Sequence, residues 1–217
     1  PCDAPRWRVR RLYRQAESEL REALEAYGYY ASTVTRSLRF GTDCWTATLN
    51  VVAGEPVRIR AVDVRVDGPG HAQPGFAALR TNSPVVVGNT LEHAAYERDK
   101  RRFGDLATRL GYFDAKFTTA RIDVHVPEQA ADIVLVYETG PRYRYGDVSF
   151  DQQVISETLA ARYVDFAPGQ PYDAAQIREL YQALLATSYF ASVDIRTTPR
   201  EAEAVVDVAV RLTAAKH

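Results

Sequence analysis

The alternation of apolar and polar residues changes its period along the chain, and the changes predict amphipathic helices that lead into short strands. From Arg6 to about Tyr27, apolar residues recur every three or four positions, which is the spacing of one helix face. Residues 31–40 and 45–52 then alternate with a period of two, as in strands with one buried face. The start of the chain therefore predicts one long helix followed by a β-hairpin. The apolar stripe of that helix consists of Val9, Leu12, Tyr13, Ala16, Leu20 and Leu24.

The end of this helix recurs twice farther along the chain. Residues 24–30 (LEAYGYY), 106–113 (LATRLGYF) and 184–190 (LLATSYF) each close a helical pattern with a small residue and two aromatic residues, at intervals of about 80 residues. Gly28 and Gly111 suit the left-handed backbone that commonly ends a helix. Ser188 stands at the third such position, where we expect a less favourable cap. The chain is therefore predicted to repeat one module three times.

A second motif marks the joints between the modules. GEPVRI at 54–59 and GPRYRY at 140–145 each follow one alternating strand and lead into another. Glycine and proline at these places are turn residues that the middle of a strand does not accommodate. The joints are short, so we expect neighbouring modules to be held at limited angles. The predicted joint residues are Gly54, Glu55, Pro56, Gly140 and Pro141.

One complete module has the element order β-α-α-β-β, so the predicted fold class is α+β. Each module is expected to form a three-stranded mixed sheet with two helices on one face. The third copy predicts a strand at 142–150, helices at 153–163 and 173–186, and a hairpin at 191–197 and 202–212. The second copy repeats this order with elements at 57–66, 76–80, 91–110, 116–126 and 132–138.

The first copy lacks a counterpart of the opening strand and helix. Either this module is atypical or the sequence begins inside it, and we favour the second interpretation. The predicted domains are residues 1–54, a shortened first module; residues 55–140, the second module; and residues 141–217, the third.

Composition narrows the classes of function. The chain has 217 residues, a net charge of −1, 46% hydrophobic and 25% charged residues, which is typical of a folded globular protein. No apolar run approaches the roughly 18 residues of a membrane-spanning helix. Methionine is absent, so we expect a chain processed from a precursor, with its targeting information missing. The sequence contains no nucleophile elbow, phosphate-binding loop or metal-ligand spacing, so we expect neither an enzyme nor a cofactor.

Two basic runs offer an alternative, nucleic-acid binding. Basic runs on helices are usually solvated faces, and a neutral chain gives no general attraction to nucleic acid. We therefore predict no nucleic-acid partner. Contact with anionic lipid headgroups or with an acidic partner is the favoured use of these charges. The first run comprises Arg6, Arg8, Arg10, Arg11 and Arg14 with Trp7 and Tyr13 interleaved, and the second comprises Arg98, Lys100, Arg101 and Arg102.

The combined motifs resemble a known family. The β-α-α-β-β order, the helix end at 26–30 (AYGYY) and 109–114 (RLGYFD), the joint at 140–146 (GPRYRYG) and the loop at 166–172 (FAPGQPY) are similar to POTRA (polypeptide-transport-associated) domains. Three modules in series resemble the periplasmic part of the TamA family, the outer-membrane component of the translocation and assembly module. The resemblance covers essentially the whole chain and is carried by the order of the motifs, since no single one is specific.

This resemblance implies a place and a role. It implies modules on the periplasmic side of the bacterial outer membrane, followed by a membrane β-barrel that the present sequence lacks. It also implies clients that are unfolded outer-membrane proteins or autotransporters, and a TamB-like partner anchored in the inner membrane. The alternative within the same fold is the POTRA region of a two-partner-secretion transporter or of another insertase branch.

The edges of such sheets are candidate docking sites for extended clients. An edge strand presents unpaired N–H and C=O groups that a peptide of almost any sequence can pair with. We expect the first strand of each closing hairpin at an edge, where it is either simply solvated or a docking strand. The candidate residues are Lys116, Phe117, Thr118, Thr119, Ala120, Arg121 and Ile122 in the second module, and Ala191, Ser192, Val193, Asp194 and Ile195 in the third.

The fold also gives the two cysteines, Cys2 and Cys44, a role. A helix of about 22 residues and a return strand of about 10 residues both span about 33 Å. Cys2, before the helix, and Cys44, after the strand, are therefore expected at the same end of the first module. Since the implied periplasmic location permits disulfides, we favour a Cys2–Cys44 bond over two free thiols.

Overall fold

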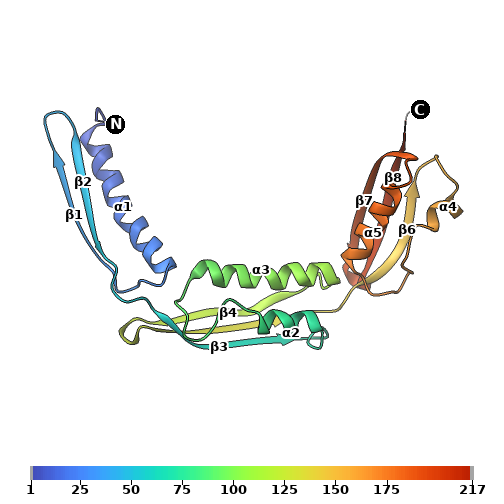
Figure 1. Cartoon of the computed structure of the whole chain (residues 1–217), viewed down its shortest axis with the longest axis horizontal. Helices are drawn as coiled ribbons and strands as arrows, with labels where there is room; N and C mark the ends of the chain where they lie inside the picture. Colours follow the sequence, from blue (N-terminus) through green and yellow to red (C-terminus); the bar gives the residue numbers. More distant parts are fainter. Residues whose placement is uncertain (1, 216–217) are drawn as a thin grey trace. The chain divides into compact units, whose positions relative to one another are not determined.

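The computed structural model describes residues 2–215, and Figure 1 shows their helices and strands. The complete order β-α-α-β-β occurs twice and is preceded by one α-β-β copy. The first copy comprises α1 (Arg6–Ala26), β1 (Thr33–Phe40) and β2 (Trp45–Val52). The second comprises β3 (Arg58–Asp67), α2 (Pro74–Thr81), α3 (His93–Leu110), β4 (Lys116–His125), the 3₁₀ turn η1 (Val126–Glu128) and β5 (Ala130–Glu138). The third comprises β6 (Arg144–Asp151), α4 (Glu157–Ala161), α5 (Ala174–Leu185), β7 (Phe190–Arg200), η2 (Glu201–Glu203) and β8 (Val205–Ala214).

The strands form three separate sheets, and this confirms the predicted α+β class. The strand orders are β1-β2, β3-β5-β4 and β6-β8-β7. In the third sheet β8 pairs in parallel with β6 and antiparallel with β7, so the sheet is mixed. The last strand of each complete module is therefore central, and the first strand of the closing hairpin, β4 or β7, lies at an edge.

The chain divides into two compact units. One comprises residues 1–64, 82–100 and 119–135, and the other comprises residues 65–81, 101–118 and 136–217. The middle sheet contributes residues to both units, whereas each predicted joint lies inside one unit. The module boundaries at 54/55 and 140/141 stay a prediction.

In the first unit, α1 and the β1-β2 hairpin bury few side chains. Val9 is the buried residue of α1, and Val34 is the buried residue of the hairpin. The two strands pair antiparallel from Thr33 opposite Val52 to Phe40 opposite Trp45. A helix and two strands leave one flank of the sheet without a neighbour, so little apolar surface is removed from water.

In the second unit, the third sheet has a continuous core. β8 buries every second residue, as a strand with one covered face does. Leu180 and Leu184 of α5 pack into the same cluster. The Tyr145 ring stacks on Phe166 with 3.9 Å between the ring centroids. The buried residues of β8 are Val206, Val208, Val210 and Leu212.

Helix ends follow the sequence with one exception. The Asp173 carboxylate accepts a hydrogen bond from the Ala175 amide at 2.8 Å and begins α5 as expected. The helix predicted over residues 153–163 was wrong in length, because α4 spans only Glu157–Ala161. The Gln152 side chain accepts from the amides of Val154 and Ile155 at 2.7 and 3.0 Å, so this segment forms a turn instead of a helix. Helix α4 then begins at the Ser156 cap.

Candidate peptide-docking edges

A loop covers the outer edge of β3 where the strand begins. The Ile59 amide donates to the Asn89 carbonyl at 2.8 Å, and the Gly88 amide donates to the Ile59 carbonyl at 2.8 Å. Gly88 has a φ of 90°, the left-handed conformation that glycine adopts without steric cost. The start of this edge is therefore already paired.

The third sheet repeats this arrangement at β6. The Tyr145 amide donates to the Gln170 carbonyl at 2.8 Å, and the Gly169 amide donates to the Tyr145 carbonyl at 2.7 Å. Gly169 has a φ of 82°. The loop motif at 166–172 thus covers the edge of the third sheet where β6 begins.

The opposite edge of the third sheet, at β7, is open. Within residues 136–215, no backbone hydrogen bond joins the strand β7 to a segment other than β8. A pocket of about 400 Å³ follows this edge between β7 and α5, and Val193, Asp194 and Ile195 form its strand side. Ala191 and Ser192 precede it, beside a register shift that follows Phe190. The helix side is formed by Ala174, Ile177, Arg178 and Tyr181.

The first residues of the edge strand β4 are anchored by ring contacts and a hydrogen bond. The Phe117 ring lies 4.7 Å from the Tyr137 ring and 5.9 Å from the Phe103 ring, measured between centroids. The Thr118 hydroxyl donates to the Val136 carbonyl at 3.3 Å. Lys116, Thr118, Ala120 and Arg121 are exposed, whereas Phe117, Thr119 and Ile122 are half-buried. A peptide that paired with this edge would meet a strand that is already anchored from behind.

Each candidate docking strand carries an exposed ion pair. Arg196 on β7 contacts Asp194 at 3.1 Å, and Arg121 on β4 contacts Asp123 at 2.7 Å. Exposed pairs of this kind add little stability, but they leave no strong net charge along the edge. Main-chain pairing there would therefore tolerate clients of different charge.

The middle sheet carries a cluster of charged side chains around Arg60. Arg60 Nε contacts Asp132 Oδ1 at 2.9 Å, and Arg60 Nη1 contacts Glu128 Oε2 at 2.6 Å. Hydrogen bonding to Arg60 lowers the pKa of Asp132, and hydrogen bonding to Asp132 raises the pKa of Arg60. His125 Nε2 also approaches Asp132 Oδ2 at 3.3 Å. These shifts arise from an exposed ion-pair cluster across strands, which is a structural arrangement rather than an acid–base pair in a cleft.

Backbone hydrogen bonds from residues outside the predicted joints also stabilise the two joints. The Val57 amide donates to the Gly28 carbonyl at 2.8 Å, and the Tyr143 amide donates to the Gly111 carbonyl at 2.8 Å. Gly28 and Gly111, with φ of 90° and 82°, thus both end a helix and accept the first strand of the next module. Gly54 and Gly140 also have positive φ, at 73° and 62°.

Arginine strengthens the second joint. Arg142 Nε donates to the Leu110 carbonyl at 2.8 Å, and its Nη2 donates to the Tyr172 carbonyl at 3.1 Å. The GPRY motif contained this signal, but sequence spacing alone could not show that the guanidinium reaches two carbonyls on different segments. Phe113 adds an edge-on contact with the Tyr143 ring at 5.2 Å.

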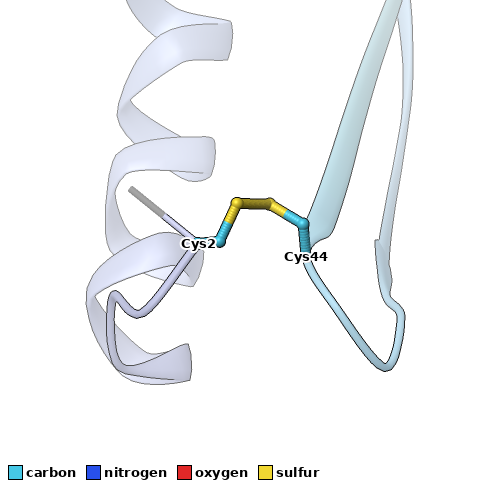
Figure 2. Close-up of a disulfide and its surroundings, with 2 residues drawn as sticks. All are labelled: Cys2 and Cys44. Atoms are coloured by element: carbon cyan, nitrogen blue, oxygen red, sulfur yellow. A yellow bond between two sulfur atoms is a disulfide. The ribbon is translucent and has the colours of Figure 1, made fainter.

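Figure 2 shows the disulfide between Cys2 and Cys44. It connects the segment before α1 to the turn between β1 and β2, with 4.7 Å between the two Cα atoms. The two cysteines are therefore at the same end of the first module, as the lengths of helix and strand predicted. The bond closes the module at the end opposite the first joint.

Among residues 2–215, no group of three or more His, Cys, Asp or Glu residues is placed to hold a metal ion. None of the helices in this described part of the chain has the length and apolar character needed to cross a membrane.

Comparison with known families matches both ends of the chain. Residues 1–53 match the family described as POTRA domain TamA domain 1, and residues 143–214 match the POTRA family described as surface antigen variable number repeat. Both matches are to POTRA families, and they support POTRA domains of the BamA/Omp85 superfamily. POTRA domains of this superfamily lie in the periplasm at the outer membrane, and this is the location of the chain.

A curated relative is similar to most of the chain. The chain is 25% identical over 215 residues to the outer membrane protein assembly factor BamA of Nitratidesulfovibrio vulgaris, with 88% of the chain aligned. It spans about a quarter, 26%, of the length of that relative.

Solved structures show the same fold. The crystal structure of POTRA domains 3–5 of BamA from Haemophilus influenzae matches with a TM-score of 0.53 and 16% identity, over 93% of this chain and 80% of that one. BamA from Haemophilus ducreyi lacking POTRA domains 1–3 matches with a TM-score of 0.54 and 13% identity, over 73% of this chain and 29% of that one.

Proposed function

We propose that this POTRA array belongs to a TamA-type insertase and binds extended segments of unfolded outer-membrane proteins or autotransporters by strand addition. The observation that carries the proposal is the asymmetry of the third sheet. The start of β6 is closed by its own loop, whereas β7 is open beside a pocket of about 400 Å³. The match of residues 1–53 to the first TamA POTRA domain supports the TamA type.

Main-chain pairing suits a binder of many clients. Each peptide residue that joins an edge strand directs its backbone groups to the strand and its side chains alternately to the two faces. At β7, side chains on one face would enter the pocket beside α5, where Ile177 and Tyr181 provide apolar contact. The backbone supplies affinity for any sequence, and the pocket favours segments with apolar residues at alternate positions.

The β4 edge is proposed to act in the same way. Its strand lies at the outer position of the middle sheet and is anchored by Phe117. The array would also contact a TamB-like partner anchored in the inner membrane, and its outer-membrane anchor would be a C-terminal barrel. The matched TamA domain supports both assignments, which concern the whole protein.

A proline scan tests strand addition. Proline removes one N–H from an edge, whereas alanine retains it. We expect Thr118→Pro and Ile195→Pro to reduce photo-crosslinking of an unfolded outer-membrane client, with Thr118→Ala and Ile195→Ala close to wild type. Circular dichroism and a thermal melt establish that each variant is folded. Unchanged crosslinking in folded proline variants throughout 118–122 and 191–195 would contradict the proposal.

A further inference from the structure

The third POTRA domain has a second surface depression, on the side away from β7. This pocket of about 650 Å³ lies between β6 and the segment from α4 to the loop that precedes α5. Val148, Phe150, Val164 and Phe166 provide its apolar lining. The remaining lining residues are Asp147, Ser149, Glu157, Ala161 and Pro168.

The strand beside this pocket has a free edge along its second half. The covering loop pairs with β6 only near Arg144 and Tyr145. Within residues 136–215, no backbone hydrogen bond joins the stretch 147–151 to a segment other than β8. An extended peptide could therefore continue the pairing where the loop ends.

A register shift marks the beginning of the free stretch. The pairing of β6 with β8 shifts between Tyr145 and Val148, and the Asp147 amide donates to the Asp207 carboxylate at 2.9 Å instead of to a backbone carbonyl. Such irregularities bend a strand and re-aim its side chains. Asp147, which lies at this irregularity, is one of the residues that line the pocket.

The polar lining of the pocket is acidic. Asp147 and Glu157 are exposed, and neither carboxylate forms an ion pair with a residue of the described chain. The pocket lining contains no Lys or Arg. On β7, by contrast, Asp194 is paired with Arg196 at 3.1 Å. Unpaired acidic groups beside an apolar floor favour a ligand that carries an apolar side chain and positive charge.

We propose that the outer edge of β6 is a second docking edge, which takes an extended peptide with a bulky apolar residue flanked by Lys or Arg. The apolar residue enters the pocket between Phe150 and α4. Basic residues two positions away lie on the same face of the peptide and pair with Asp147 and Glu157. This proposal extends the proposed function to a third edge and adds a charge preference that β4 and β7 lack.

A short peptide of fixed sequence is the probe. In Thr-Lys-Thr-Phe-Thr-Lys-Thr, labelled with fluorescein, the Phe and both Lys side chains share one face. Binding to the full 217-residue chain is measured by fluorescence anisotropy. A peptide with Glu in place of Lys tests charge, and a peptide N-methylated on alternate amides tests strand pairing, because it cannot donate to the edge.

Two matched variants locate the binding site. Ala161 is exposed on α4 and lines the pocket, whereas Ala167 is exposed on the nearby loop and does not line it. We expect Ala161→Trp to weaken the Lys peptide by about tenfold or more, because the indole fills the pocket, with Ala167→Trp unchanged. Asp147→Asn combined with Glu157→Gln should weaken binding by about threefold to tenfold, with the difference shrinking at high salt.

The outcomes separate this proposal from the proposed function. Equal binding to Ala161→Trp and Ala167→Trp, equal binding of the Lys and Glu peptides, or no binding at all would overturn the β6 edge. If Ile195→Pro abolishes binding and Ala161→Trp does not, the peptide occupies β7, so the β6 proposal falls and the proposed function stands. Loss of client crosslinking at β4 and β7 is measured independently with the proline variants.

Discussion

The first and third POTRA domains use the same helix-and-hairpin element but bury very different amounts of it. Helix α1 buries Val9 alone, whereas α5 buries Leu180 and Leu184. No residue of β2 is buried, whereas β8, at the corresponding place, buries every second side chain. The difference is the neighbour: β8 has β6 beside it, and β2 is paired with β1 alone.

This contrast shows how little apolar surface a helix and a hairpin bury when the sheet has no third strand. Two strands with one helix leave apolar surface facing solvent, including a pocket of about 150 Å³ between α1 and β2. A covalent bond then contributes stability that the core does not supply. In the third domain the core itself is sufficient, and residues 143–215 contain no cysteine.

The largest effect is expected from removing the disulfide. Replacing Cys2 and Cys44 by Ser releases a loop whose ends are 42 residues apart, which corresponds to about 4 kcal/mol in the chain-entropy description. We expect hydrogen exchange in α1 and the β1-β2 hairpin to accelerate strongly. Exchange in β6 and β8 should stay unchanged and serves as the internal control. Equal protection of α1 in oxidised and substituted protein would contradict this role.

Matched leucine truncations sharpen the difference between the cores. Leu184→Ala removes a fully buried side chain and should lower the free energy of unfolding by about 3–4 kcal/mol. Leu24, at the corresponding place in α1, is half-buried, and Leu24→Ala should cost about 1 kcal/mol. Urea denaturation, monitored by hydrogen exchange in each domain, measures the loss in free energy of unfolding for both variants. Equal costs at the two positions would mean that the first domain has a core as complete as the third.

The joint glycines should be more sensitive than a free glycine of the same conformation. A Cβ on Gly28 would lie 2.8 Å from the Leu91 carbonyl oxygen, and one on Gly111 would lie 2.9 Å from Tyr172 Cβ. Gly169 has the same positive φ but nothing within 4 Å of that position. Gly169→Ala should therefore cost about 1 kcal/mol, and the two joint substitutions about 2–3 kcal/mol. If all three costs are equal in thermal melts, the joints are not sterically tight.

The smallest effect is expected at alkaline pH. Burial raises the pKa of Tyr137 and of Tyr145 to about 12, above the ordinary value of 10.0. A tyrosine that resists ionisation in the folded state stabilises the fold fully below pH 10, and this stability is lost as the pH rises from 10 towards 12. Tyr145→Phe should reduce the decrease in stability of the third domain between pH 10 and pH 12. The first domain, which has no fully buried tyrosine among its described residues, should show a weaker dependence. Melts of the wild type and variant across this pH range provide the measurement.

Much of this architecture was predictable because the same helix-end motif occurs three times in the sequence. The positive φ of Gly28, Gly111 and Ser188, at 90°, 82° and 60°, confirms the helix ends inferred from spacing. The disulfide followed from the equal lengths of a helix and a strand. These features depend on local backbone conformation and on the lengths of helices and strands, and both can be inferred from a single sequence.

Other features depended on contacts between distant segments. The length of α4 was mispredicted because the Gln152 side chain accepts hydrogen bonds from two backbone amides, which sequence periodicity does not reveal. The closed starts of β3 and β6 were missed because the loops around Gly88 and Gly169 show no strand pattern. The register shift between Tyr145 and Val148, beside the β6 pocket, was also missed, because hydrophobic periodicity does not predict such shifts.

In the proposed function, the open edges β4 and β7 bind extended clients by backbone pairing. Hydrogen exchange measured with and without a saturating unfolded outer-membrane client tests this most directly. From this binding mode we expect new protection within residues 116–122 and 191–195 and no change at Ile59 and Tyr145, whose amides are already bonded to their covering loops. Client binding that leaves both edge strands unprotected would contradict it.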